Sequence, residues 1–468
     1  MSSMRKSDKQ LHVAMFPWLA FGHILPFFEL AKVLAHKGQV RITFISTPGN
    51  INRLPKIPRH IEPFITLVSL PFLHEHKASL PENGESTMDV PIDKAAELIM
   101  AYEGLQESLA QLLKSSAPNW ILFDFIGHWI PPLAKSLNIP CAFFCIFPAL
   151  DTCFFHIPKS HLGNPASFRT KIEDFFGPPK WVPFPSNIGL KFHEVKKIFG
   201  GPHFAQNDHE DTILTCDLFV YRSCTEFESE WLNLVGELHN KPVIPVGVIP
   251  PTLQVRDADE EDKNPMWANI KSWLDKQRHG SVVYVAFGSE IKIPQEDITE
   301  MALGLELSGF PFFWVIRKQQ LSLTDLPNGF EDRTKDRGIV CKDWVPQLKI
   351  LAHESVGAYF THCGAGSILE GLNFGRVLVT LPFYVDQSLH ARVLEEKKVG
   401  VEIPRNEQDG SFTRTSVAKS LMLAMVDEEG SIYRDKAKEM GLLFSDSHIQ
   451  ERYIENFIEY LQNYKLKN

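Results

Sequence analysis

Short apolar runs alternate with longer amphipathic stretches along the whole chain. Short runs rich in β-branched and aromatic residues are typical of buried strands, and apolar positions three and four apart are typical of helices. Strands that alternate with helices indicate βαβ units and parallel sheets. The expected strands are 11–17, 40–46, 120–123, 141–145 and 218–222 in the first half, and 281–287, 312–316, 357–360, 377–381 and 400–403 in the second.

The same alternation occurs twice, so we expect an α/β protein with two domains. A chain of 468 residues also exceeds what one hydrophobic core usually organises. Between the halves, a proline-rich stretch is followed by a charged one, a composition typical of a linker. The expected domains are 1–245 and 263–448, with a linker at 246–262 and a C-terminal helix at 449–468.

Charge and composition exclude several classes of protein. The net charge of -9, without a run of Lys and Arg, argues against a nucleic-acid partner. The first apolar run is only as long as a strand and soon meets Gly22 and His23, so it resembles neither a signal peptide nor a membrane span. The seven cysteines form no CxxC pair. We therefore expect a cytoplasmic protein with reduced, buried thiols.

The strongest local motif is a strand, a turn and a helix in the sequence Tyr359-Phe-Thr-His-Cys-Gly-Ala-Gly-Ser-Ile-Leu-Glu370. A helix that starts after small residues leaves backbone N–H groups and its positive dipole end free to bind an anion. Gly364 and Gly366 permit close approach, and His362 and Ser367 can add side-chain donors. The motif predicts a phosphate site, although glycines used only for tight packing would give the same pattern.

A dinucleotide-binding fingerprint is the main alternative for this turn. The fingerprint needs a third glycine where this chain has Leu369, and its ribose-binding acid should follow about 20 residues later, whereas Glu370 is one turn into the helix. A NAD(P)-dependent oxidoreductase is therefore the weaker reading. It would bind NAD(H) and ignore uridine nucleotides.

A wider segment, from Trp344-Val-Pro-Gln through the glycine turn to Tyr384-Val-Asp-Gln387, resembles the nucleotide-sugar signature of plant family 1 UDP-glycosyltransferases. The resemblance extends from His12 to the C-terminal helix. It implies a GT-B fold, in which two Rossmann-like domains face each other across a cleft. It also implies that Trp344 stacks on uracil, with the backbone of Val345 and the side chain of Gln347 nearby.

The same resemblance assigns the rest of the donor. Glu370 should bind the ribose, and Asp386 with Gln387 should bind the sugar hydroxyls, a task that suits a carboxylate beside a carboxamide. Ser289, in the turn after the strand at 281–287, should lie near the phosphates. The remaining donor-binding residues are His362, Gly364, Ala365, Gly366, Ser367 and Tyr384.

The chain departs from the family pattern at Ala365 and Gly366, where Trp and Asn are usual. An indole and a carboxamide donor are therefore missing beside the donor. Gln387 favours UDP-glucose by family habit, whereas the lost indole leaves room for a deoxy sugar such as that of UDP-rhamnose. We expect one of these two co-substrates, no permanently bound cofactor and no metal.

His23 and Asp124 are the candidate catalytic pair. His23 opens the first helix and Asp124 ends a neighbouring strand. In the family the equivalent histidine is the general base, and an acid bound to one ring nitrogen would fix its tautomer, as in a Ser-His-Asp triad. We expect inversion by one in-line displacement on an acceptor hydroxyl. A histidine that only caps or packs a helix start is the plainer reading.

The acceptor is expected to be a small natural product. The stretch 400–410, together with Ala365-Gly366, resembles the sugar-branching group of the family, whose members extend the sugar of a flavonoid, terpenoid or steroid glycoside. A noncatalytic nucleotide-sugar-binding protein is an alternative, against which the presence of both catalytic residues argues. We expect a monomer whose acceptor pocket is lined by the aromatic residues Trp18, Phe21, Phe125, Trp129 and Phe147.

Overall fold

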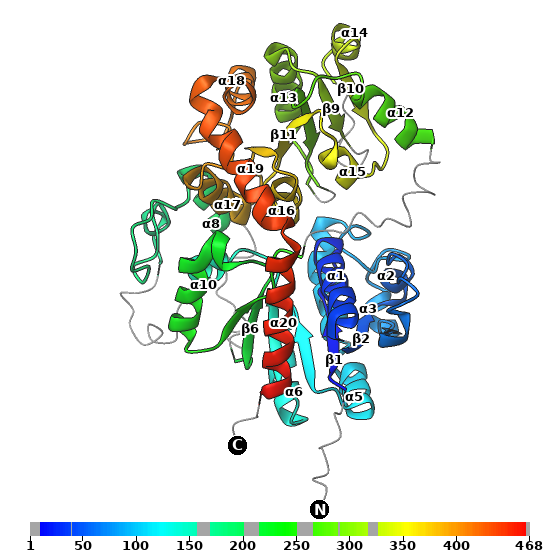
Figure 1. The fold of residues 1–468 in the computed structure, drawn as a ribbon. Coiled ribbons are helices and arrows are strands. Elements are labelled where there is room, and N and C mark those ends of the chain that lie inside the picture. Colours follow the sequence, from blue (N-terminus) through cyan, green and yellow to red (C-terminus); the bar gives the residue numbers. More distant parts are fainter. Residues whose placement is uncertain are drawn as a thin grey trace, which may run out of the picture. The chain divides into compact units, whose positions relative to one another are not determined.

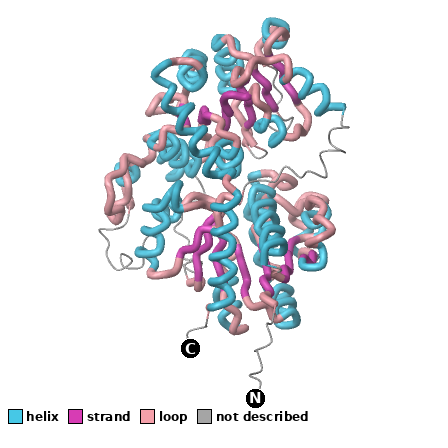
Figure 2. Tube along the Cα trace, in the orientation of Figure 1, coloured by secondary structure: helices cyan, strands magenta, loops and turns pink. Residues whose placement is uncertain are grey.

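The computed structural model describes residues 10–38, 40–156, 169–200, 215–249, 265–288, 291–316 and 326–464. They form two compact units. The first takes in the described residues of Met1–Ser160, Gln206–Ile249 and His448–Asn468, and the second those of His161–Ala205 and Pro250–Ser447. In each unit, strands lie in the middle and helices cover them on both sides (Figure 2).

The first unit contains a parallel sheet in the order β3-β2-β1-β4-β5-β6-β7. Its strands pair in register, so that Ala14 lies beside Ile121 and Phe16 beside Phe123. The chain order reverses between β1 and β4, and their carboxyl ends therefore meet at a topological switch point, where ligands bind in such sheets. The strands are β1 (His12–Phe16), β2 (Arg41–Ser46), β3 (Ile65–Ser69), β4 (Trp120–Phe123), β5 (Cys141–Cys145), β6 (Leu218–Tyr221) and β7 (Val243–Pro245).

The helices of this unit bury apolar residues against the sheet. Helix α1 places Phe27, Phe28 and Leu34 in the core, where Phe28 meets Phe44 of β2 edge to face. The helices are α1 (Phe21–Gly38), α2 (Pro48–Asn52), α3 (His74–Lys77), α4 (Ala95–Glu103), α5 (Gln106–Ser116), α6 (Ile130–Ser136), α7 (Ala149–Phe155), α10 (Thr225–His239) and α20 (Ser447–Asn463).

Helix α20 belongs to the core of the first unit, although it lies at the other end of the chain (Figure 1). Ile454, Phe457 and Leu461 are buried against residues of β1 and β4. The indole Nε1 of Trp120 also donates to the Leu461 carbonyl at 3.1 Å. The helix therefore completes the hydrophobic core of the N-terminal sheet.

The second unit contains a parallel sheet in the order β10-β9-β8-β11-β12-β13. The chain order reverses between β8 and β11, which gives a second switch point. The strands are β8 (Val282–Ala286), β9 (Phe312–Val315), β10 (Gly338–Cys341), β11 (Val356–Thr361), β12 (Val377–Thr380) and β13 (Gly400–Glu402). The helices are α8 (Phe192–Gly200), α12 (Pro265–Leu274), α13 (Gln295–Ser308), α14 (Phe330–Thr334), α15 (Gln347–Ala352), α16 (Ala365–Asn373), α17 (Val385–Glu396), α18 (Arg414–Met425) and α19 (Ser431–Ser445).

Each of the ten expected strands is present within one or two residues of its expected range. The strands that the pattern did not predict are β3, β7 and β10, which lie at sheet edges. Residues of β3 and β10 are mostly exposed or half-buried, and β7 ends on Pro245. Edge strands need less apolar sequence because one side faces no neighbour, and proline is tolerated there.

The units differ from the expected domains at 169–200, the described part of 161–205. These residues are expected in the first domain but group with the second unit. The reason is a set of ion pairs: Glu194 of α8 binds Arg392 of α17, and Lys191 binds Glu402 of β13. Of the expected linker, 246–249 is described as part of the first unit and the remainder lies outside the described residues. Within the described part of the chain, no helix is both long and apolar enough to cross a membrane.

Candidate active site

His23 and Asp124 meet at the carboxyl edge of the first sheet. His23 lies in the first turn of α1, and Asp124 directly follows β4, which pairs with β1. The His23 Nδ1 donates to the Asp124 Oδ2 at 2.9 Å, which leaves Nε2 as the ring nitrogen that can accept a proton. The two residues are 8% and 1% exposed, so the pair is shielded from water but not sealed.

Backbone groups hold the carboxylate of Asp124 in place. The N–H of Trp18 donates to Oδ2 at 3.0 Å, and the N–H of Phe125 donates to Oδ1 at 2.8 Å. Hydrogen bonds to the charged form of a carboxylate favour that form. The arrangement is the histidine–acid relationship that the sequence predicted, and it can hold one tautomer of His23 and stabilise its protonated ring.

Two of the expected acceptor residues flank the imidazole. The ring centroids of Phe125 and Phe147 lie 5.1 and 5.3 Å from that of His23. Both rings are half-buried, and they meet each other edge to face at 5.9 Å. Phe21 packs beside the core with the Arg53 guanidinium 4.9 Å above its ring. An apolar molecule beside His23 would therefore contact Phe125 and Phe147 first.

Trp18 and Trp129 lie in a buried aromatic cluster. Both are only 6% exposed, and both pack on Tyr102, at 5.3 and 5.9 Å between ring centroids. Tyr102 in turn stacks on Phe16 at 4.8 Å. These rings support the strand ends that carry Asp124, and they offer a ligand little surface. The pattern could not separate them from lining residues, because apolar rings near a strand end suit both positions.

The glycine turn of the second unit has the predicted strand–turn–helix geometry. Strand β11 ends at Thr361, and Gly364 is the N-cap of α16 with extended backbone. The first backbone N–H groups of a helix have no partner within the helix, and its dipole favours an anion at this end. The Tyr359 hydroxyl donates to Ser367 Oγ at 3.3 Å, which fixes the serine beside the turn.

His362 fits between two glycines. A Cβ on Gly364 would lie 2.5 Å from its Nε2, and a Cβ on Gly288, whose φ is +69°, would lie 2.9 Å from its Cε1. Burial and the neighbouring charge of His390 lower the pKa of His362 to about 4. The ring is therefore neutral near pH 7 and can donate through one nitrogen only.

His390 supports the turn, and the sequence pattern did not single it out. Cys363 has a φ of +70°, an uncommon left-handed conformation for a residue with a side chain. His390 lies on α17, and its buried Nδ1 donates to the Cys363 carbonyl at 3.1 Å. Its position one helical turn after Asp386 was the available signal, since i and i+4 share a helix face.

The residues that are expected to bind the nucleoside include a hydrogen-bonded chain. The Gln347 Nε2 donates to Glu370 Oε2 at 2.6 Å, and the Tyr284 hydroxyl donates to Gln347 Oε1 at 3.0 Å. Trp344 is 69% exposed, while Val345 is buried. Tyr284 lies inside β8, where a strand pattern favours a core residue, and this explains why sequence reasoning missed its role.

The remaining expected residues cluster at the start of α17. Tyr384 is its N-cap and is 44% exposed. The Gln387 Oε1 accepts from the backbone N–H groups of Phe383 and Tyr384 at 3.0 and 3.1 Å, so only its Nε2 is left to donate to a ligand. Asp386 lies in the first turn of α17. Ala365 and Gly366 are half-buried, and a Cβ on Gly366 would meet open space.

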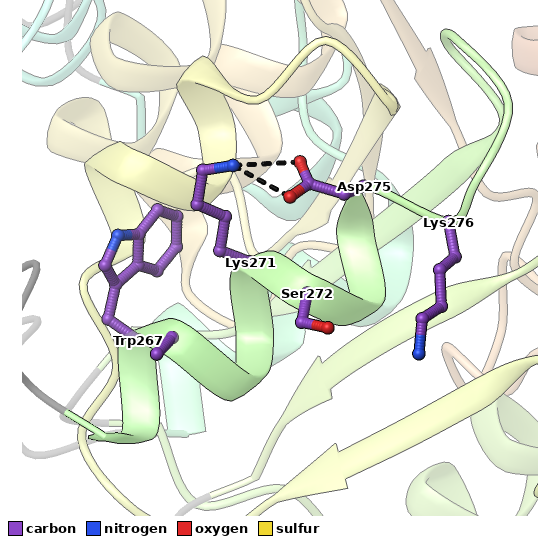
Figure 3. Close-up of a pocket in the computed structure, with 6 residues that line it drawn as sticks. Trp267, Lys271, Ser272, Asp275 and Lys276 are labelled. Atoms are coloured by element: carbon purple, nitrogen blue, oxygen red, sulfur yellow. Dashed lines mark hydrogen bonds and ion pairs between the residues drawn. The ribbon is translucent and has the colours of Figure 1, made fainter.

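Two expectations remain open here, and one groove lies away from the expected site. Ser289 lies outside the described residues. The described residues contain no cluster of three or more potential metal ligands, and the expected absence of a metal stays a prediction. A shallow groove of about 500 Å³ runs along α12, where Lys271 pairs with Asp275 (Figure 3), but none of the expected site residues line it.

The chain is similar to known proteins of one family. The family described as "UDP-glucoronosyl and UDP-glucosyl transferase" matches residues 237–450. A soyasaponin III rhamnosyltransferase of Glycine max is 50% identical over 99% of this chain and 98% of its own length. UDP-glycosyltransferase 91A1 of Arabidopsis thaliana is 45% identical over 97% of each chain.

A solved structure gives the same fold. UGT73P12 of Glycyrrhiza uralensis, complexed with glycyrrhetinic acid 3-O-monoglucuronide, superposes with a TM-score of 0.81 at 23% identity, over 97% of this chain and 96% of that one. The two sheets, each with its own switch point, are thus the two Rossmann-like domains of a GT-B fold. The protein belongs to the plant family 1 UDP-dependent glycosyltransferases, enzymes that transfer a sugar from a UDP-sugar to a hydroxyl of a small molecule.

Proposed function

We propose that this enzyme adds rhamnose or glucose, with inversion, to a sugar hydroxyl of a terpenoid, steroid or flavonoid glycoside. The observation that carries the proposal is the His23–Asp124 pair at 2.9 Å, because it provides an oriented base at a switch point. The half-buried rings of Phe125 and Phe147 beside His23 suit an acceptor with an apolar core.

The proposed reaction is a single displacement. The Nε2 of His23 takes the proton of the acceptor hydroxyl, whose oxygen forms a bond to the anomeric carbon. The bond from that carbon to the phosphate oxygen breaks, and UDP leaves with the electron pair. Asp124 stabilises the protonated imidazole, while the N-terminus of α16 and the ring of His362 stabilise the charge on UDP.

For the donor, Trp344 would stack on uracil and Glu370 would bind the ribose. The ribose would then compete with Gln347 for Glu370, since the Gln347 Nε2 donates to that carboxylate at 2.6 Å. Asp386 and the Nε2 of Gln387 would bind the sugar. We infer rhamnose as the preferred sugar because Gly366 faces open space and the soybean relative carries a rhamnosyltransferase name.

For the acceptor, the soybean relative is named for a saponin, and saponins as a class are glycosides of terpenoid or steroid cores. The decisive experiment incubates the purified enzyme with UDP-rhamnose or UDP-glucose and a panel of aglycones paired with their monoglycosides, read by mass spectrometry. The expected result is one rhamnose added to monoglycosides and none to aglycones. Efficient transfer to aglycones would reject the branching activity, and exclusive use of UDP-glucose would reject the donor assignment.

We also propose that the enzyme works as a monomer in the cytoplasm. The net charge of -9 favours a protein that stays dispersed, and no described helix could anchor it in a bilayer. Light scattering of the purified protein and fractionation of the expressing cells test these two statements separately. A concentration-independent dimer, or recovery with membranes, would contradict them.

A further inference from the structure

The turn that carries Asp386 and Gln387 is held by Arg405, and the helix that follows the turn is tied to α8 by Arg392. This turn, residues 382–387, joins β12 to α17. Arg405 binds it from the stretch that follows β13, and Arg392 lies on α17 and binds Glu194 of α8. Neither arginine belongs to the expected donor-binding residues.

Arg405 bridges two loops. One guanidinium nitrogen, Nη2, donates to the Pro382 carbonyl at 2.9 Å, and the other, Nη1, donates to the Gly410 carbonyl at 2.6 Å. The guanidinium also lies 5.4 Å from the ring centroid of Phe383 and 5.0 Å from that of Phe412. A planar cation that donates in two directions while stacked on aromatic rings has few free rotations, so it fixes the Pro382 carbonyl in space.

Arg392 ties α17 to α8 by a bidentate ion pair. Its Nη2 lies 2.9 and 2.8 Å from the two carboxylate oxygens of Glu194, and its Nη1 donates to the Ser388 carbonyl. Glu194 is 4% exposed. Burial raises its pKa, but the charge of Arg392 and hydrogen bonds from Lys191 and Ser388 outweigh this effect, so the pKa is lowered and the carboxylate is charged.

Further contacts attach α8 to the same part of the unit. The Lys191 Nζ donates to Glu402 Oε1 at 2.8 Å, and the backbone N–H of His193 donates to the Glu407 carbonyl at 3.2 Å. A Cβ on Gly410 would lie 2.5 Å from the His193 ring. Helix α8, α17 and the stretch 405–410 therefore form one hydrogen-bonded assembly behind the turn.

We propose that Arg405 and the Arg392–Glu194 pair are positioning residues that set how the enzyme holds the sugar of its donor. The proposal rests on the proposed function, since it assigns the sugar to Asp386 and Gln387. In the proposed function, the uridine, ribose and diphosphate would contact α15, α16 and the glycine turn before α16. The link from α17 to that turn is made by His390, whereas Arg405 and Arg392 donate to the carbonyls of Pro382 and Ser388. Loosening the assembly should therefore weaken binding of the sugar part and spare binding of UDP.

The test compares Arg405→Met with the matched control Arg337→Met. Arg337 also donates to backbone carbonyls, those of Leu305, Glu306 and Phe310, and lies over the ring of Phe312, but it holds the β9–β10 edge of the sheet. Calorimetry measures the dissociation constants of UDP, UDP-glucose and UDP-rhamnose for each variant. Melting curves verify that each variant is folded.

For Arg405→Met, we expect the dissociation constant of UDP to stay within about twofold and that of the preferred UDP-sugar to rise about tenfold relative to UDP, which is a loss of about 1.4 kcal/mol. Arg405→Lys should fall between this variant and the native enzyme, because an ammonium cannot bridge both carbonyls. Arg337→Met should leave the ratio of the two dissociation constants, that of the UDP-sugar to that of UDP, unchanged. An unchanged ratio in Arg405→Met, or an equal change in Arg337→Met, would overturn the proposal.

The Glu194→Gln variant tests the role of the Arg392–Glu194 pair. It also replaces Arg405→Met as the main test if Arg405→Met does not fold. Glutamine preserves the shape of the side chain but removes the charge that binds Arg392. The ratio of the dissociation constants of UDP-sugar and UDP should therefore shift by about threefold or more. A Glu194→Gln, Arg392→Met double variant should shift the ratio no further, because both substitutions break the same pair. An unchanged ratio in Glu194→Gln would contradict the positioning role of the Arg392–Glu194 pair. If the native enzyme does not bind UDP, the proposed function itself is wrong.

Discussion

The imidazole of His362 occupies the space into which a side chain on Gly364 would project, because a Cβ there would lie 2.5 Å from Nε2. The backbone of Gly364 is extended and would accept any residue. The glycine is therefore needed for the ring of its neighbour rather than for its own dihedral angles.

Gly364→Ala should displace the His362 ring and weaken UDP binding about tenfold, since overpacking costs about 1–3 kcal/mol. Gly177→Ala is the matched control, because Gly177 is not among the donor-binding residues and its added methyl group would meet open space. Calorimetric titration with UDP measures both variants. Equal affinities of the two variants would contradict the close fit around His362.

His23→Ala should reduce the turnover number by about 10²–10⁴, the range that a general base contributes, and should leave the dissociation constant of UDP unchanged. Asp124→Asn should have a smaller but similar effect, because it cannot stabilise a protonated ring. Initial rates with saturating donor and acceptor, measured beside UDP titrations, separate the two effects. Turnover near the native rate in His23→Ala would reject the base.

His12 should make the free energy of unfolding fall as the pH drops. Its Nε2 bonds Thr43 and its Nδ1 accepts from Arg41, and burial, followed by the charge of Arg41, lowers its pKa to about 4 from 6.5. Below pH 6.5 the unfolded chain binds a proton that the folded chain refuses, so the stabilisation is complete above pH 6.5 and is lost as the pH falls toward 4.

Urea unfolding of the native protein and of His12→Gln, at several pH values between 7 and 4, measures this dependence. The variant should lose stability less steeply across the window, because glutamine does not titrate. Parallel curves for the two proteins would show that the proton uptake arises at other groups.

Phe457→Ala should destabilise the first unit by about 3–5 kcal/mol, since the ring is fully buried in the core that α20 completes. Glu459→Ala, at an exposed position of the same helix, should change stability by less than about 0.5 kcal/mol. Thermal unfolding compares the two variants, and UDP titration of the folded proteins should give the same affinity. Similar melting temperatures would contradict the role of α20 in this core.

The sequence predicted the features that depend on strong local patterns. Buried central strands read as apolar runs, and a residue directly after such a strand lies at the carboxyl edge, which places Asp124 there. The pairing of Asp124 with His23 was implied by the family resemblance, and the two side chains are hydrogen-bonded. The glycine turn was equally readable, because a strand, small residues and a helix start occur in immediate succession.

The sequence could not predict contacts for which a side chain has two possible partners. Gln387 can bind a sugar or cap its own helix, and its Oε1 takes the backbone. Trp18 and Trp129 could line a pocket or fill a core, and Tyr102 provides the core. Glu194 and Arg392 are 198 positions apart, and no local pattern connects them, so the sequence did not show that 169–200 groups with the second unit.

The attachment of α20 to the first sheet also constrains the order in which the chain folds during synthesis. Because Ile454, Phe457 and Leu461 fill the core beneath β1 and β4, the ribosome must release the last helix before that core can close. The second unit has its sheet and surrounding helices between residues 169 and 446, and can therefore consolidate earlier. We therefore expect the second unit to fold before the first, the reverse of the usual order during synthesis, in which the N-terminal domain folds first.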